Sequence, residues 1–156
     1  MGPMRLVMSC VFVGLAFAAP PLHAQPRASG QMLVADGIEV YYGFVPAAIT
    51  RRHPAGHPER PMHGGTAGTA EEEHLVVALF DAATKQRIEN AEVRATIGPA
   101  GAHAQGKALE PMRIADTVTY GNYFALPAPG NYRIDLQIRV PGRAGMVSAR
   151  FAHQRR

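Results

Sequence analysis

The chain has 156 residues, a formal net charge of +4, a single cysteine, no tryptophan, 16 glycines and 13 prolines. This is the length of one ordinary domain, and so many glycine and proline residues are typical of strands joined by turns. The basic residues are scattered and do not alternate with aromatic residues, which argues against a nucleic-acid-binding surface.

Residues 1–24 have the pattern of a secretory signal peptide. Arg5 forms a short basic region, residues 7–19 are apolar, and an acceptable cleavage site follows. The apolar run is too short to span a membrane, and Cys10 within it does not belong to a lipoprotein box. We therefore expect a periplasmic protein that starts near Gln25, contains no cysteine and does not span the membrane after cleavage.

The mature chain, residues 25–156, is expected to form a single domain. Residues 25–31 have the composition of a leader, and residues 38–44 alternate as a first strand. Residues 50–69 are rich in histidine, proline and glycine and have no hydrophobic period. A connection of this length within a compact domain indicates either disorder or function.

The rest of the chain alternates between apolar and polar residues, which is the pattern of half-buried strands. The clearest face holds Leu136 at its centre, between Tyr132 and Val140. No amphipathic helix is expected after the signal peptide. About seven strands with regular turn signals predict an all-β fold, an immunoglobulin-like antiparallel β-sandwich. The six further strands are expected at residues 74–81, 91–97, 107–115, 119–126, 131–140 and 147–151.

Four residues are candidates for metal ligands. Met62 and His63 lie in the 50–69 loop, His74 begins a strand, and Met112 follows a proline beside a polar corner. Imidazole and thioether groups together suit copper, especially cuprous copper, better than magnesium or calcium. Two alternatives stay open, because histidines in loops are often only solvated and methionine most often fills a gap in a core.

Three short motifs stand out, Pro111-Met112, Asp116 with Tyr120-Gly121, and Gly130-Asn131-Tyr132. They resemble motifs of the periplasmic high-affinity iron-transport proteins, small β-sandwiches that bind copper or iron beside an inner-membrane iron permease. The resemblance implies that copper or iron is bound, that Met112 is a ligand and that a membrane permease is the partner. Thr119 occupies the position of a metal-binding histidine in that family.

Signatures of enzymes are missing from the sequence. There is no Gly-x-Ser-x-Gly elbow, no His-Glu-x-x-His motif, no phosphate-binding glycine loop and no cysteine in the mature chain. We therefore do not expect an enzyme. Tyr123 is expected to have a structural role, its hydroxyl bonding to nearby backbone as in the tyrosine corner of β-sandwiches.

These observations lead to one main hypothesis and one alternative. The main hypothesis is a periplasmic protein that binds a transition metal, copper or else iron, and assists metal uptake or homeostasis. Met112 and Met62 would supply thioethers, and His63 and His74 imidazoles. The alternative is a non-metal interaction or scaffold module of the transthyretin or carboxypeptidase-regulatory type, which would use the same Asp-x-x-Thr turn at Asp81.

Overall fold

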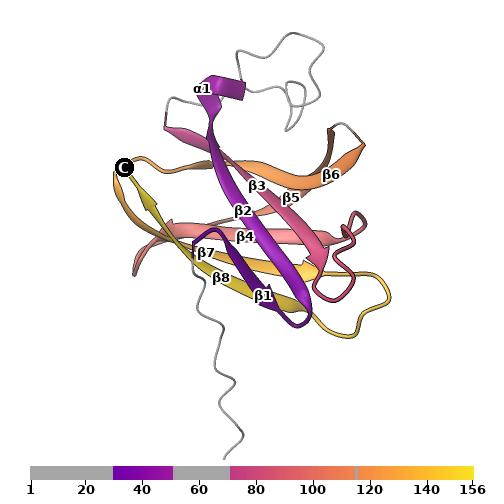
Figure 1. Ribbon diagram of the computed structural model, residues 1–156. Helices are drawn as coiled ribbons and strands as arrows, with labels where there is room; N and C mark the ends of the chain where they lie inside the picture. The colour runs from indigo at the N-terminus through magenta and orange to yellow at the C-terminus, as the bar shows by residue number, and fades with distance from the viewer. Residues whose placement is uncertain (1–29, 51–70, 115) are drawn as a thin grey trace, which may run out of the picture.

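The computed structural model describes residues 30–50, 71–114 and 116–156. These residues form eight strands and one short helical turn, α1 (Ala47–Thr50) (Figure 1). No helix among them is long and apolar enough to cross a membrane. The strands are β1 (Met32–Ala35), β2 (Ile38–Pro46), β3 (Glu72–Asp81), β4 (Glu92–Pro99), β5 (Gln105–Ile114), β6 (Thr117–Ala125), β7 (Gly130–Arg139) and β8 (Val147–Arg155).

All neighbouring strands are antiparallel and form one sheet in the order β1-β2-β3-β6-β5-β4-β7-β8. Strand β5 belongs to both halves of this sheet. Its residues 105–109 pair with β4, whereas residues 110–114 pair with β6. The sheet therefore bends at β5, and the two halves face each other as a nearly closed barrel (Figure 1).

The all-β antiparallel prediction is confirmed. All seven strands expected from the sequence are present, with ends that differ by a few residues. An additional strand, β1, immediately follows the segment expected to be a leader and pairs with β2. Its four residues are too few to give a clear alternating pattern, which is why the sequence did not reveal it.

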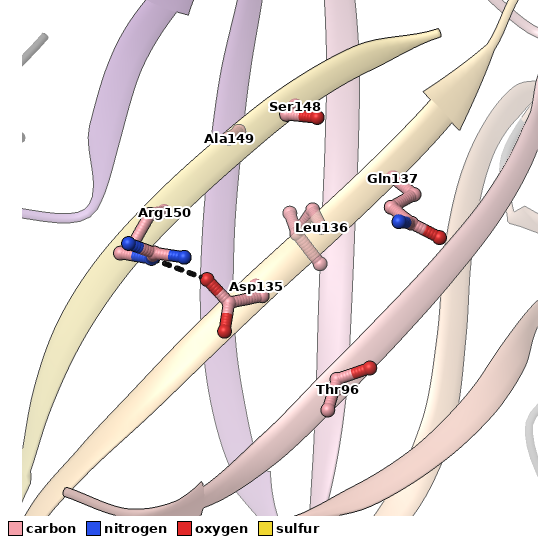
Figure 2. Close-up of a pocket in the computed structure, with 7 residues that line it drawn as sticks. All are labelled: Thr96, Asp135, Leu136, Gln137, Ser148, Ala149 and Arg150. Carbon is pink, nitrogen blue, oxygen red and sulfur yellow. Dashed lines mark hydrogen bonds and ion pairs between the residues drawn. The ribbon is translucent and has the colours of Figure 1, made fainter. Parts of the chain in front are cut away.

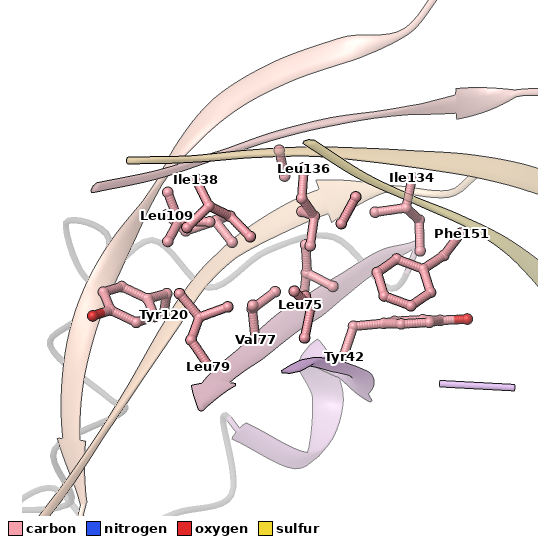
Figure 3. Packing of buried hydrophobic residues seen from close by; sticks show 14 of the residues in the cluster. Tyr42, Leu75, Val77, Leu79, Leu109, Tyr120, Ile134, Leu136, Ile138 and Phe151 are labelled. Atoms are coloured by element: carbon pink, nitrogen blue, oxygen red, sulfur yellow. The ribbon is translucent and has the colours of Figure 1, made fainter. Parts of the chain in front are cut away.

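The core lies between the two halves of the sheet, and every strand contributes apolar residues to it (Figure 3). The face expected on β7 is confirmed, because its alternate residues from Tyr132 onward are buried. Leu136 is 1 % exposed and points toward Leu75 and Val77 of the opposite half (Figure 3). Burial of these side chains is the main source of stability.

Side chains join the two ends of the sheet. The Tyr42 ring packs on Phe151 with centroids 4.7 Å apart, and its hydroxyl donates a hydrogen bond to the Ala152 carbonyl at 3.3 Å. Phe44 packs on His153 at 4.5 Å. Arg155 forms an ion pair with Glu73 at 2.9 Å. Strands β2 and β3 are thus held to β8 across the interior without a shared backbone ladder.

The Asp-x-x-Thr turn expected after β3 is present. The Asp81 carboxylate accepts hydrogen bonds from the backbone nitrogens of Thr84 at 2.8 Å and Ala83 at 3.1 Å. These bonds, together with the nearby Arg143 guanidinium, lower the pKa of Asp81. Arg143 also donates to the Asp36 carbonyl at 3.3 Å. It therefore ties the loop between β7 and β8 to the turn between β1 and β2.

We expect Leu136→Ala to lower the free energy of unfolding by about 2–5 kcal/mol, because it leaves a cavity in a packed core. Chemical denaturation monitored by circular dichroism measures this change. Gln137→Ala, one residue along the same strand and exposed on the outer face, is the matched control. A loss at Leu136 no larger than that at Gln137 would contradict the burial of Leu136 in a packed core.

We expect the free energy of unfolding to fall as the pH drops below about 6.5, the pKa of a histidine in an unfolded chain. Burial against the aromatic rings lowers the pKa of His153, while Glu73 partly opposes this shift. The folded protein therefore binds fewer protons than the unfolded chain, and acid favours unfolding. His153→Phe should reduce the drop in melting temperature between pH 7.5 and pH 5.5. An unchanged drop would exclude His153 as its source.

Candidate metal centre

Two of the predicted ligands, His74 and Met112, are buried on the outer side of the sheet. Leu75, Val77 and Leu79 of β3 face the core, so the alternation places His74 on the opposite face. His74 is nevertheless only 1 % exposed. Met112 of β5 is 0 % exposed, yet it does not belong to the main core cluster. Met112 is therefore fully buried, but on the side of the sheet that holds His74 and not within the main core cluster.

Gly121 of β6 creates the space in which these two side chains meet. A Cβ atom at this glycine would lie 2.5 Å from the Met112 methyl carbon, 2.7 Å from His74 Nε2 and 2.9 Å from the Leu75 carbonyl oxygen. All three distances are far shorter than the normal contact of about 3.5–4.0 Å. The end of the Met112 side chain and His74 Nε2 therefore share the volume that any other residue would fill.

Tyr123 covers the His74 ring. The two residues are partners in the ladder between β3 and β6, and their rings stack with centroids 4.7 Å apart and planes 28° apart. Hydrogen bonds of the tyrosine-corner kind are made by Tyr120. The Tyr120 hydroxyl accepts a hydrogen bond from Ala91 N at 2.9 Å and donates to the Ile88 carbonyl at 3.0 Å.

Thr119 lies directly across the ladder from Met112. Its hydroxyl oxygen is buried and has no hydrogen-bond partner among the residues that the structure describes. A buried hydroxyl without a partner costs free energy, so its presence at this position calls for an explanation. This is the position that the family resemblance assigns to a histidine, and the structure places it beside Met112 on the side of the sheet that holds His74.

The Pro111-Met112 step lies within β5 rather than in a loop. It is on the half of the strand that pairs with β6 alone, and proline is tolerated at such an edge because no hydrogen-bond donor is needed there. The expected polar corner containing Gly121 is likewise the interior of β6. A glycine inside a strand often marks a close approach, and this signal could have identified Gly121 as part of the site.

The other two predicted ligands, Met62 and His63, lie outside the described residues. Among the residues that are described, no three histidine, cysteine, aspartate or glutamate side chains converge on one point. The described part of the site is thus one imidazole and one thioether, which meet in the space beside Gly121 and are flanked by Tyr123 and Thr119. Imidazole and thioether ligands together suit copper, especially cuprous copper, better than magnesium or calcium.

Comparison with known proteins gives matches in structure only, since no family model and no curated protein matches the sequence. The "as isolated" FetP of uropathogenic Escherichia coli strain F11, expressed in the periplasm, has a TM-score of 0.62 and 16 % identity over 81 % of this chain and 93 % of its own. Copper-reconstituted P19 of Campylobacter jejuni has a TM-score of 0.61 and 13 % identity, covering 80 % of this chain and 92 % of its own.

A DUF4426 family protein of Pseudomonas aeruginosa has the same fold, with a TM-score of 0.55 and 11 % identity over 80 % of this chain and 94 % of its own. Other similar structures are copper-bound variants of FetP and P19. The remote resemblance expected from the sequence is confirmed at the level of the fold.

We expect Gly121→Ala to lower the free energy of unfolding by about 1–3 kcal/mol, because the new methyl group must displace Met112, His74 or the backbone of β3. It should also shift the NMR signals of the His74 ring protons, which lie beside the Tyr123 ring. Gly43→Ala is the matched control in β2, where nothing lies within 4 Å of the added carbon. Equal effects at both glycines would mean that Gly121 has no special packing role.

Proposed function

We propose that this protein binds copper through His74 and Met112 and takes part in copper uptake or homeostasis. The observation that carries the proposal is the convergence of His74 Nε2 and the Met112 side chain on the volume left free by Gly121. Both side chains are buried, and neither belongs to the main core. A methionine and a histidine that meet in the space left by a glycine within a strand form a soft ligand pair.

The fold supports the same proposal. Solved structures with this fold include copper-reconstituted P19 and copper-bound FetP, although identities of 13–16 % mean that the likeness itself concerns only the fold. We further propose Met62 and His63 as additional ligands. In this proposal copper is the cargo rather than a resident cofactor, and iron is the second candidate. The protein would capture the metal and pass it to an inner-membrane permease, and it would not be an enzyme.

The remaining features of the proposal follow from the sequence. Residues 1–24 would be a cleaved signal peptide, the mature protein would be periplasmic, and the bent sheet would be an immunoglobulin-like sandwich. Partial coordination by a few exchangeable ligands suits transfer better than a closed structural site, in which all four positions are filled by the protein.

We expect Met112→Leu to weaken binding of cuprous copper by about 100-fold or more, since removal of even an indirect partner of a metal ligand costs 10–100-fold. Leucine keeps the volume, so stability should change by less than about 1.5 kcal/mol. Competition titration against a colorimetric cuprous chelator measures the affinity. Met146→Leu is the matched control, because Met146 is 44 % exposed and lies outside the site.

Two further measurements test the same proposal. Binding should weaken below about pH 6, because imidazole must be neutral to ligate and its ordinary pKa is about 6.5. Thr119→His should raise the affinity, since it adds an imidazole directly opposite Met112. A scaffold module would behave differently. Its copper affinity would be weak and equal in the wild type and in Met112→Leu, and Thr119→His would bring no gain.

A further inference from the structure

The outer face of β4, β7 and β8 is rich in arginine. Its four arginines alternate along their strands with residues of the core, so they all project away from the barrel. We call this surface the arginine face. It is formed by Arg94 of β4, Arg133 and Arg139 of β7, and Arg150 of β8.

Asp135 fixes two of these arginines. Arg133 Nε donates to one carboxylate oxygen at 2.8 Å, and Arg150 Nε donates to the other oxygen (Figure 2). Both bonds use Nε only, and no hydrogen bond joins a terminal guanidinium nitrogen of either arginine to a described residue. One carboxylate therefore holds both guanidinium groups in place, and their terminal nitrogens stay available to donate to another acceptor.

The charges on this face do not balance. One carboxylate serves both Arg133 and Arg150, and Arg139 lies 4.0 Å from Glu92 in an exposed pair. Arg94 donates a hydrogen bond to the Gly106 carbonyl at 3.4 Å and forms no ion pair with a carboxylate in the described part of the chain. An excess of positive charge spread over several strands favours an anionic partner.

Polar and apolar groups accompany the arginines. A shallow groove along the face is lined by Thr96, Asp135, Gln137, Ser148 and Arg150. In Figure 2 the Arg150 guanidinium faces the Asp135 carboxylate, and the hydroxyl and amide groups lie farther along the groove. At its margin Met146, 44 % exposed, borders a second hollow together with Arg94 and Arg139. This combination suits an array of phosphates above an apolar layer.

We infer that the arginine face docks the protein on a membrane surface containing anionic phospholipids. The spread of cations over three strands favours this partner over a single acidic side chain, and the exposed methionine favours it over a purely polar acidic protein. The arginine face and the metal centre lie on opposite outer sides of the barrel, because one belongs to β4-β7-β8 and the other to β3-β6-β5. Docking would leave the outer side of β3, β6 and β5, which holds the metal centre, facing away from the membrane.

The test compares two variants of equal net charge. Arg133→Gln with Arg150→Gln removes two charges from the arginine face. Lys85→Gln with Arg113→Gln removes two charges elsewhere, at side chains that are 65 % and 62 % exposed and likewise paired with carboxylates. Co-sedimentation with vesicles of phosphatidylglycerol and phosphatidylcholine, and with phosphatidylcholine alone, measures binding of protein recovered from the periplasm of an expression host.

We expect the wild type to bind the anionic vesicles and to be released by high salt. Each arginine near an anionic surface contributes a factor of about five, so loss of two should weaken binding of the arginine-face variant about 25-fold. The control variant should lose no more than about threefold. Because all proteins in the comparison share every other segment, the difference reports on the arginine face alone.

Three results would overturn the inference. The first is equal binding of the wild type to anionic and neutral vesicles. The second is an equal loss in the two variants, which would reflect net charge and not this surface. The third is binding to immobilised polyglutamate, but not to anionic vesicles, that is lost in the arginine-face variant. That result would assign the surface to an acidic protein.

Discussion

The absence of a side chain at Gly121 is the constraint on which the candidate site depends. Strands β3, β6 and β5 lie side by side, and their outward residues would normally be separated by the side chain in the middle strand. With glycine there, an imidazole from one side and a thioether from the other enter the same volume. The Leu75 carbonyl closes the third side, so backbone as well as side chains limits the space. Tyr123 then fixes the plane of the ring by stacking on it.

The bend of β5 explains why this space lies where it does. Backbone pairing between β5 and β6 ends at Glu110 and Gly121, since the earlier part of β5 turns toward β4. Beyond that point, side chains bridge the diverging strands. Asn122 donates to the Ala108 carbonyl at 2.8 Å and Lys107 to the Tyr123 carbonyl at 2.6 Å. Two backbone carbonyl oxygens at the bend thus accept side-chain hydrogen bonds, and the buried pair lies at its edge.

Much of the architecture could be predicted from the sequence because burial imposes a period on strands. The alternation around Leu136 revealed both the strand and its inner face. For the site, the sequence could offer only residue types. Side-chain chemistry and the family resemblance point to His74 and Met112, but their proximity depends on pairing between strands distant in sequence, which no local pattern encodes. Tyr120 and Tyr123 show the same limit, because only the ladder register decides which ring enters the core.

The strand order also has a consequence for folding. Strands β4, β5 and β6 follow one another closely along the chain, and β4 pairs with β5 and β5 with β6, so these contacts form over short loops. The pairing of β3 with β6 and of β4 with β7 spans much longer segments and must overcome a larger loss of chain entropy. His74 belongs to β3, whereas Met112 belongs to the local meander. The two side chains therefore meet only after the slow, long-range pairing has taken place, and a partly folded chain lacks the pair altogether.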